Sequence, residues 1–242
     1  MGKTKRDKYL KIKGMSMLEF LPKGGRVRSV NGIKAIPREG TDDFVLLFGP
    51  REKEVMALLD LANGETFVDV GANVGGYTLK VAAGNKSVNV IAIEAHPGNY
   101  QALRRNVECN GFTNVLAINK AVTDKIGTVM IYDRYKLAGN LCTGTATIDG
   151  SKDNTFNPLE VPCDTLDNVL ANYAPDVVKM DIEGAEVSAL KGATKTLGKV
   201  RRIIIEVHDS KIEEARSELV KAGLIVYEMI SDGMPYLVGE RK

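Results

Sequence analysis

Apolar runs and amphipathic stretches alternate along the chain from residue 66 onward. Each apolar run has the length of a buried strand and is followed by a longer segment with helical periodicity. The predicted strands are TFVDV (66–70), SVNVIAIE (87–94), NVLAINKAV (114–122), APDVVKMDI (174–182) and RRIIIEVH (201–208). The predicted helices cover residues 74–84, 97–110, 185–197 and 211–222. Strands that alternate with helices predict a parallel sheet with helices on both faces.

The last two apolar segments follow a different pattern. LIVYEMI (224–230) and MPYLVGE (234–240) are separated by Asp232-Gly233, which is a hairpin signal. Together with the five strands before them, they predict an α/β, Rossmann-like sandwich. Its mostly parallel seven-stranded sheet ends in a C-terminal antiparallel hairpin, an arrangement that few doubly wound folds share.

The alternation divides the chain into an N-terminal extension (1–65) and a main domain (66–242). The extension contains a predicted hairpin that turns at Asn31-Gly32 and a predicted helix near residues 50–62. Within the domain, a polar stretch rich in Gly, Thr, Asn and Ser covers residues 138–157. It follows a strand-like piece, GTVMIYD, and is either a lid or substrate-selection element or a flexible surface loop.

Composition agrees with a soluble globular protein. The 242 residues suit one domain with a substantial core, and 44% of them are hydrophobic and 26% charged. No apolar stretch approaches the roughly 18–20 residues that span a bilayer. The Lys-rich N-terminus lacks the apolar core of a signal peptide, so we expect a cytoplasmic protein. Three cysteines at irregular spacing form neither a metal-ligand pattern nor a disulfide framework.

Charge is distributed unevenly along the chain. Residues 1–28 hold nine Lys and Arg against Asp7 and Glu19, a net charge of +7. The remaining 24 basic and 29 acidic residues give −5. Such a basic arm could contact nucleic acid or anionic lipid, and it could equally be a solvated tail.

The stretch FVDVGANVGGYT (67–78) places a glycine-rich turn between a predicted strand and a predicted helix, where open α/β sheets bind ligands. No Gly-Lys-Ser/Thr follows, which argues against a P-loop. A carboxylate at Asp69 would repel a pyrophosphate on the helix N-terminus. S-adenosylmethionine carries no phosphate, and its ammonium and sulfonium groups are cationic. Asp69 therefore favours this methyl donor over a dinucleotide.

A second acid supports an adenosine-containing ligand. Glu94 ends the next predicted strand, 23 residues beyond Gly71. An acid at that place can accept hydrogen bonds from the two ribose hydroxyls. His96, two residues further, is expected beside the adenosine and not at the reacting atoms.

With these motifs in place, the chain resembles the FkbM-like S-adenosylmethionine-dependent methyltransferases. The most specific match is VVKMDIEGAEVSALKGA (177–193). The other matching stretches are VDVGANVGGYTL (68–79), IEAHPGNYQALRRNVECNG (93–111), NKAVTDKIGTVMIY (119–132), VPCDTLDNVL (161–170) and IIIEVH (203–208). The resemblance implies a class I methyltransferase fold, S-adenosylmethionine as the cofactor with S-adenosylhomocysteine as its product, and methyl transfer to a hydroxyl oxygen.

The resemblance also extends the set of cofactor contacts. Thr41 and Asp42 lie in a stretch similar to the Gly-Thr-x-Asp segment that precedes the domain in the family and reaches toward the cofactor. The candidate cofactor-binding residues are Asp69, Gly71, Ala72, Asn73, Gly75, Tyr77, Thr78, Glu94, Ala95, Thr41, Asp42 and Asp181.

Methyl transfer to a hydroxyl needs alignment of acceptor and donor and a general base near the acceptor proton. Asp181 and Glu183 end the fourth strand, and their spacing of two predicts carboxylates on one side of an extended chain. Their mutual repulsion would raise one pKa, and Lys179 could moderate that effect. Glu206 and His208 repeat the pattern on the fifth strand. These four are the candidate catalytic residues, although Asp181 or Glu183 could instead cap the helix near residue 185.

Alternatives remain for the metal and for the function. A divalent metal at Asp181, Glu206 and His208 is possible, but no tight ligand cluster requires one, so we assign no metal site. The leading function is O-methylation of a small-molecule or glycan hydroxyl. The alternatives are an RNA methyltransferase that uses the basic arm, and a non-catalytic S-adenosylmethionine-binding domain.

Overall fold

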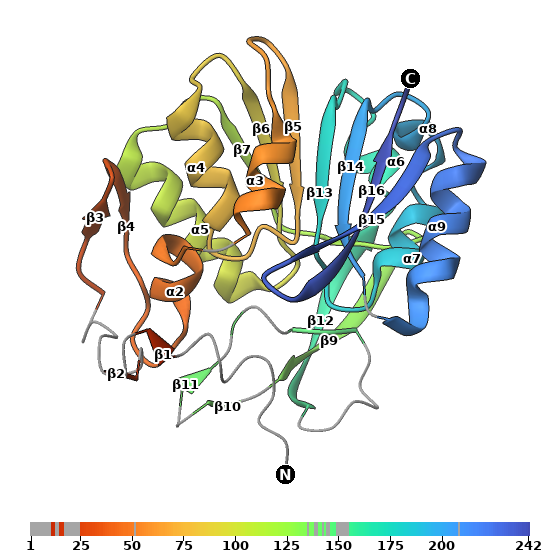
Figure 1. Ribbon diagram of the computed structural model, residues 1–242. Helices are drawn as coiled ribbons and strands as arrows, with labels where there is room; N and C mark the ends of the chain where they lie inside the picture. Colours follow the sequence, from red (N-terminus) through yellow and green to blue (C-terminus); the bar gives the residue numbers. More distant parts are fainter. Residues whose placement is uncertain are drawn as a thin grey trace.

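In the computed structural model, the described residues are 11–12, 15–16, 25–50, 52–134, 136–137, 140–141, 143, 146–148, 155–207 and 209–242. Within them, the main sheet has seven strands in the order β15-β16-β14-β13-β5-β6-β7 (Figure 1). Five of these strands are parallel neighbours: β7 (Val115–Ile118), β6 (Asn89–Ile93), β5 (Thr66–Val70), β13 (Val177–Met180) and β14 (Arg202–Glu206). The sheet is completed by β16 (Met234–Glu240), which is antiparallel to β14, and by the edge strand β15 (Ile225–Ser231). The predicted fold class is confirmed.

Helices cover both faces of this sheet because its strands are apolar on both sides. On one face lie α3 (Lys53–Leu59), α4 (Gly76–Gly84) and α5 (Pro97–Asn110). On the other lie α6 (Leu166–Val169), α7 (Glu186–Lys191), α8 (Thr194–Leu197) and α9 (Ile212–Lys221), the last preceded by a short 3-10 turn, η3 (Asp209–Lys211). Strand β6 shows the division: Val90 packs with α3 and α4, whereas Ile91 and Ile93 pack with α6 to α9.

Two predicted elements are divided in the structure. The helix expected over 185–197 is broken at Gly192, where a Cβ atom would lie 2.2 Å from the Thr123 carbonyl oxygen. The strand expected over 114–122 ends at Ile118, and β8 (Ala121–Val122) joins a second sheet of order β8-β12-β9. Hydrophobic periodicity along the sequence carries no information on such tertiary contacts. It therefore predicts one continuous helix and one continuous strand where the structure has two elements each.

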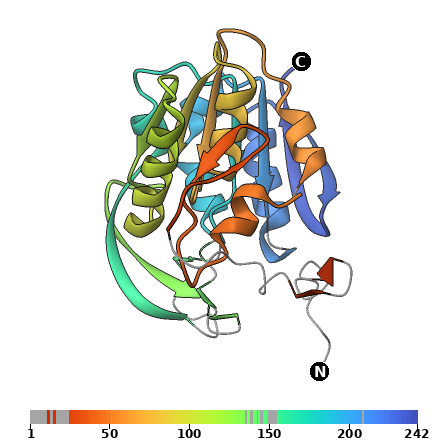
Figure 2. The same ribbon diagram turned by 90° about the vertical axis from the view of Figure 1, so that its left-hand side faces the viewer.

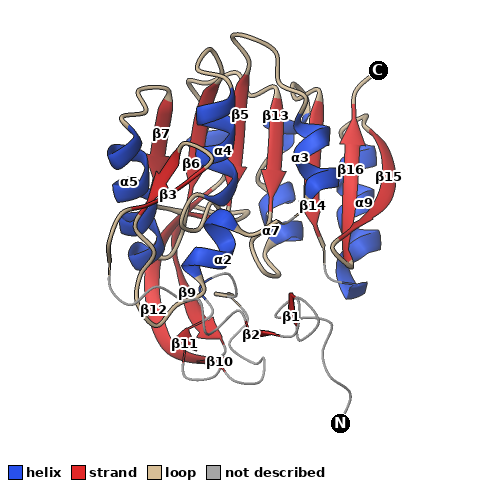
Figure 3. Cartoon of the chain, turned by 60° about the vertical axis from the view of Figure 1, so that its left-hand side comes forward, coloured by secondary structure: helices blue, strands red, loops and turns tan. Residues whose placement is uncertain are grey.

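The second sheet projects beyond the carboxyl ends of the main parallel strands (Figure 3). Strand β9 (Gly127–Arg134) matches its prediction, whereas β12 (Thr155–Asp164) was not expected as a strand. Two prolines interrupt its sequence, and proline normally weakens a strand assignment. A register irregularity between Phe156 and Leu159 accommodates Pro158. Of the polar stretch 138–157, the described parts are β11 (Asn140–Leu141), Thr143, residues 146–148 and the start of β12; β10 (Lys136–Leu137) precedes it.

The N-terminal extension packs directly on the main domain (Figure 2). The predicted hairpin is present as β3 (Arg28–Val30) and β4 (Ile33–Ala35), with positive φ at both residues of its Asn-Gly turn. The backbone amide of Ile36 donates to Asn106 Oδ1 of α5 at 2.8 Å. The helix expected near 50–62 is α3, and α2 (Asp43–Phe48) precedes it. Of the basic arm before residue 25, only β1 (Lys11–Ile12) and β2 (Met15–Ser16) belong to the described residues.

Candidate active site

Four predicted site residues form a row across the carboxyl edge of the main sheet. Val70 pairs with both Ile93 and Met180, and Met180 pairs with Ile205. The next residue along each strand therefore takes its place in this order: Glu94, Gly71, Asp181 and Glu206. Tyr236, on the antiparallel strand β16, pairs with Glu206 and extends the row. The strand register thus joins the predicted cofactor turn to the predicted acceptor carboxylates.

The glycines of the cofactor turn are required by the packing of the chain itself. Gly71 has φ of +81°, and a Cβ atom there would lie 1.9 Å from the Asp181 carbonyl oxygen. A Cβ atom on Gly76 would lie 2.7 Å from the Leu46 carbonyl oxygen. Gly75, with φ of +101°, is the N-cap residue of α4. Small residues therefore bring the turn against both the β13 end and the extension.

Asp69 binds the first turn of α4 through hydrogen bonds. Its Oδ2 accepts hydrogen bonds from the Thr78 amide at 3.1 Å and the Thr78 hydroxyl at 2.7 Å. Its Oδ1 is buried and has no hydrogen-bond partner among the described residues. Burial raises the pKa of Asp69, although nearby Lys179 and the Thr78 donors act in the opposite direction. A buried carboxyl oxygen without a partner fits a site that receives a positively charged group.

Glu94 connects the turns that follow β5 and β6. One carboxyl oxygen accepts from the Asn73 amide and the other from the His96 amide, each at 2.8 Å. Asn73 adopts a positive φ of 50°, which directs its amide toward Glu94. The Asn119 side-chain amide donates to the carbonyls of Glu94 and Ala95. Burial raises the pKa of Glu94, and the two backbone donors oppose that effect.

His96 is the N-cap residue of α5, and its ring contacts lie at the start of that helix and at Asp133. Its Nδ1 accepts hydrogen bonds from the amides of Gly98 and Asn99, and its Nε2 lies 3.4 Å from Asp133 Oδ1. An accepting Nδ1 requires the neutral imidazole in the tautomer that carries its proton on Nε2. Burial lowers the pKa of His96, in agreement with this capping role.

The extension and the polar stretch meet beside the cofactor turn through Thr143. The Thr143 amide donates to Asp42 Oδ1 at 2.8 Å, and its hydroxyl lies 3.0 Å from the same oxygen and 3.4 Å from Asn73 Oδ1. Asp42 therefore lies at the cofactor turn, and the Thr41 hydroxyl donates to the carbonyl of Arg38 nearby. Sequence reasoning did not single out Thr143, because a threonine within a Thr-rich polar stretch carries no distinguishing signal.

Lys179 of β13 places a buried positive charge near the carboxyl edge of the main sheet. Its Nζ lies 3.3 Å from Asp181 Oδ2 and 4.8 Å from the centroid of the Tyr77 ring, a cation–π contact. The Tyr77 hydroxyl in turn donates to Glu52 of the extension. Burial alone would lower the pKa of Lys179, but the surrounding carboxylates, led by Asp181, together raise it. Glu52 was not predicted, because it lies inside a stretch that reads as an ordinary helix.

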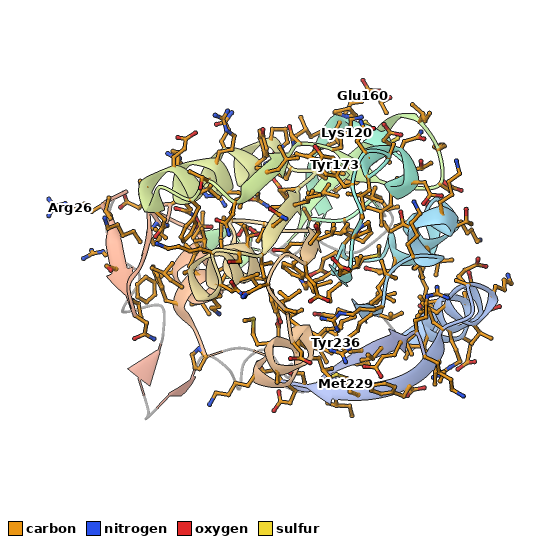
Figure 4. All side chains as sticks on the ribbon, turned by 90° about the horizontal axis from the view of Figure 1, so that it is seen from above. Arg26, Lys120, Glu160, Tyr173, Met229 and Tyr236 are labelled. Atoms are coloured by element: carbon orange, nitrogen blue, oxygen red, sulfur yellow. The ribbon has the colours of Figure 1, made fainter. Side chains whose placement is uncertain are left out.

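Glu206 lies beside this group at the end of β14. Its Oε2 accepts a hydrogen bond from the Tyr236 hydroxyl at 2.9 Å. Burial raises the pKa of Glu206 to about 8, and the carboxylates of Asp181 and Glu183 add to the shift. Tyr236 is almost fully buried on the inner strand of the closing hairpin, whereas Met229 lies on the edge strand (Figure 4). Tyr236 was also missed, since a tyrosine in a strand is usually a packing residue.

Glu183 reaches the same area by a different geometry from the one expected. Glu183 and Gly184 both have positive φ, so the chain turns directly after Asp181 and is not extended there. The alternative capping role is wrong for α7: its N-cap residue is Ala185, and the Gly184 amide donates to Glu186 at 2.9 Å. The Thr147 hydroxyl donates to the Glu183 carbonyl at 2.8 Å. His208 lies outside the described residues.

Two negative findings apply to the part of the chain that the structure describes. No three His, Cys, Asp or Glu side chains in those ranges are grouped so as to hold a metal ion. Across the same ranges, no helix combines the length and apolarity that crossing a membrane requires.

The fold and the site together define a class of protein. Class I methyltransferases have a Rossmann-like sheet with a closing antiparallel hairpin. They also have an acid and glycines at the end of the first strand and an acid at the end of the second. The chemistry of the site agrees with S-adenosylmethionine, because a cationic ligand would meet carboxyl groups there. One of them, Asp69, has a buried oxygen, Oδ1, without a hydrogen-bond partner among the described residues.

Comparison with known proteins gives the family. Residues 69–226 match the methyltransferase FkbM domain, so the chain belongs to the FkbM methyltransferase family. The hexuronic acid methyltransferase AglP of Haloferax volcanii is 27% identical over 159 residues, which cover 65% of this chain and 62% of AglP. The methyltransferase sdnD of Sordaria araneosa is 25% identical over 178 residues, covering 62% of this chain and 68% of sdnD.

A solved structure shares the fold. An O-methyltransferase family protein from Burkholderia thailandensis superposes with a TM-score of 0.50 at 13% identity, covering 83% of this chain and 58% of that protein. At that level of identity the likeness concerns the fold alone. The substrate must therefore be argued from the site.

Proposed function

We propose that this protein is an S-adenosylmethionine-dependent methyltransferase that transfers a methyl group to a hydroxyl oxygen of a glycan or small molecule. The observation that carries the proposal is the continuous row from Glu94 through Gly71 and Asp181 to Glu206 at one sheet edge. It unites a turn suited to an adenosine-containing cation with carboxyl groups suited to proton removal. A relative named as a hexuronic acid methyltransferase supports a sugar acceptor.

The cofactor side of the site would be formed by the turn after β5 and its neighbours. Glu94 would face the ribose, as acids at this position do in adenosine-binding sheets, and Asp69 would favour the cationic methionine part. Asn73, Thr41 and Asp42 would complete the rim. The remaining candidate contacts on the turn and the strand ends keep the same proposed role: Gly71, Ala72, Gly75, Tyr77, Thr78, Ala95 and Asp181. When bound, S-adenosylmethionine supplies an activated methyl group on a cationic sulfur.

The acceptor side would hold the hydroxyl in line with that methyl group and remove its proton. Asp181, Glu183 and Glu206 surround the place where the acceptor would enter, and their charges act on one another. His208 stays a candidate on sequence grounds. Four carboxyl groups act on one buried lysine, Lys179, which suits an uncharged hydroxyl better than a free anion.

The direct test is isothermal titration of the full chain with S-adenosylmethionine and with S-adenosylhomocysteine. We expect both to bind with 1:1 stoichiometry. If neither compound binds, the proposal is refuted. Turnover of glycosides in the presence of tritiated methyl donor would then separate an enzyme from a non-catalytic binding domain, which binds the donor without any methyl transfer.

The net charge of +7 on residues 1–28 favours RNA as the alternative acceptor. A gel-shift series with tRNA at increasing salt, with and without residues 1–13, distinguishes the two. An RNA substrate predicts strong binding that weakens with salt and with truncation. Weak binding that truncation does not change would remove this alternative.

A further inference from the structure

More carboxyl groups converge at the acceptor edge than the local positive charge can balance. Lys179 lies among the carboxyl side chains of Glu52, Asp69, Asp181 and Glu206, and Glu183 acts on Glu206. These five groups come from four separate segments of the chain, and Glu52, Asp69 and Lys179 are buried. Like charges held this close in a poorly solvated place cannot all be ionised, so at least one of these carboxyl groups carries a proton in the free protein.

Exposure and hydrogen bonds together single out Glu206 as its carrier. Glu52 and Asp69 are buried, whereas the Glu206 side chain at the end of β14 is half-buried and can exchange a proton with a bound ligand. Asp69 accepts two hydrogen bonds from Thr78, and Asp181 lies beside the Lys179 ammonium. The donor that the structure gives to the Glu206 carboxyl is the neutral hydroxyl of Tyr236. A neutral donor compensates a carboxylate less than an ammonium does. The rise in the pKa of Glu206 to about 8, caused first by burial and then by Asp181 and Glu183, agrees with this ranking.

A protonated Glu206 cannot accept a proton, so something must ionise it before methyl transfer. The methyl donor of the proposed function carries a positive sulfonium, whereas its product carries an uncharged thioether. We propose that Glu206, held by Tyr236, is the proton acceptor of the methyl transfer, and that the arriving sulfonium charge converts it from a carboxylic acid into a carboxylate. This inference rests on the proposed function and assigns its general base.

The charges balance over one reaction. The acceptor oxygen forms a bond to the methyl carbon, the sulfur keeps the electron pair of the broken carbon–sulfur bond, and Glu206 takes the proton from the acceptor oxygen. The positive charge on sulfur and the negative charge on Glu206 disappear together. Glu206 is then again a carboxylic acid beside an uncharged product, which is its state in the free protein.

The groups that face Glu206 from each neighbouring element have opposing effects. Lys179 of β13 favours the carboxylate, and so does the hydrogen bond from Tyr236 of β16. Asp181 and Glu183 of the β13–α7 turn favour the acid. Glu52 acts on both Lys179 and Tyr236, and Tyr77 acts on Tyr236. A cation bound within about 4–6 Å of Glu206 would add to the first group and would lower its pKa by about 1–3 units.

Proton release on binding tests the inference without any acceptor. Lowering the pKa of Glu206 from about 8 by ~1–3 units releases roughly 0.4 to 0.9 of a proton per molecule bound at pH 7. Titration calorimetry in buffers of different ionisation enthalpy counts these protons. S-adenosylmethionine and sinefungin, which carries an ammonium in place of the sulfonium, should both release them. S-adenosylhomocysteine should release far fewer.

Three variants make the result specific. Glu206→Gln should abolish the difference between S-adenosylmethionine and S-adenosylhomocysteine, whereas Glu214→Gln, an exposed glutamate on α9, should preserve it. Tyr236→Phe removes a donor that stabilises the carboxylate, so the pH of half-maximal release should move upward. Equal proton release with both compounds, or a difference that survives Glu206→Gln, would overturn the inference. If neither compound binds, the proposed function fails first and the inference fails with it.

Discussion

Lys179 is the residue whose removal most directly tests the electrostatic description of the site. Its side chain is 4% exposed and lies between Asp181 and the Tyr77 ring. A Lys179→Met change keeps much of the side-chain volume and deletes the charge. Removing one partner of a buried ion pair typically costs ~3–5 kcal/mol, because the other partner is left without compensation.

The expected cost lies at the lower end of that range and depends on pH. Asp181 is 25% exposed, so water compensates part of its charge, and we expect a loss of about 3 kcal/mol in the free energy of unfolding at pH 8. Lys179 lowers the pKa of both Asp69 and Glu206. Without it, these groups resist ionisation more strongly in the folded state. Folded-state pKa values above the unfolded ones mean that stability is lost as pH rises, so the cost should shrink toward pH 5.

Urea unfolding followed by circular dichroism at pH 5, 6.5 and 8 measures this cost. Lys86→Met, at an exposed loop position, is the matched control and should change stability by less than about 0.5 kcal/mol at each pH. A Lys179→Met cost below about 1 kcal/mol that is the same at all three pH values would refute the reasoning. It would show that the carboxyl groups around Lys179 are solvated in the folded protein.

Three further predictions use the same edge of the sheet. Glu206→Gln should raise the melting temperature above that of the wild type, and by more at pH 8 than at pH 5. The folded-state pKa of about 8 means that the wild-type carboxyl group resists ionisation, so the wild-type protein loses stability as pH rises. An equal effect at both pH values in differential scanning fluorimetry would contradict this. Gly71→Ala should give mostly insoluble or unfolded protein by circular dichroism, since its Cβ atom would meet the Asp181 carbonyl; a soluble variant of normal stability would show that the turn can move. Asp69→Asn, which keeps an acceptor for Thr78, should weaken S-adenosylmethionine binding roughly tenfold or more in calorimetry, and unchanged affinity would exclude Asp69 from the cofactor site.

Asp69 illustrates how structure refines a prediction made from sequence. From the sequence, Asp69 is expected to serve the cofactor, so an Asp69→Ala change is predicted to weaken S-adenosylmethionine binding and to leave the fold intact. In the structure, the same carboxyl also accepts both Thr78 hydrogen bonds at the start of α4. Alanine would remove those bonds inside the core, whereas asparagine removes the charge and retains an acceptor. The functional test therefore requires the asparagine variant.

The sequence by itself determined the order of the main elements. Parallel strands buried on both faces must be apolar throughout, and amphipathic helices must show their own period, so both are visible in the local pattern. The acids and glycines near the ends of the first, second, fourth and fifth strands were visible because they interrupt or follow these apolar runs. Parallel strands present their carboxyl ends at one edge, and that rule alone predicts a shared site for Asp69, Glu94, Asp181 and Glu206.

Tertiary structure decided which groups meet there and in which protonation state. Glu52, Thr143 and Tyr236 come from segments far apart in sequence and reach the site through packing that no local period records. The pKa of Glu206 depends on its burial and on its distances to Asp181, Glu183 and Lys179. Burial and distance exist only in the folded chain, because the dielectric surroundings of a carboxyl group are set by everything packed around it.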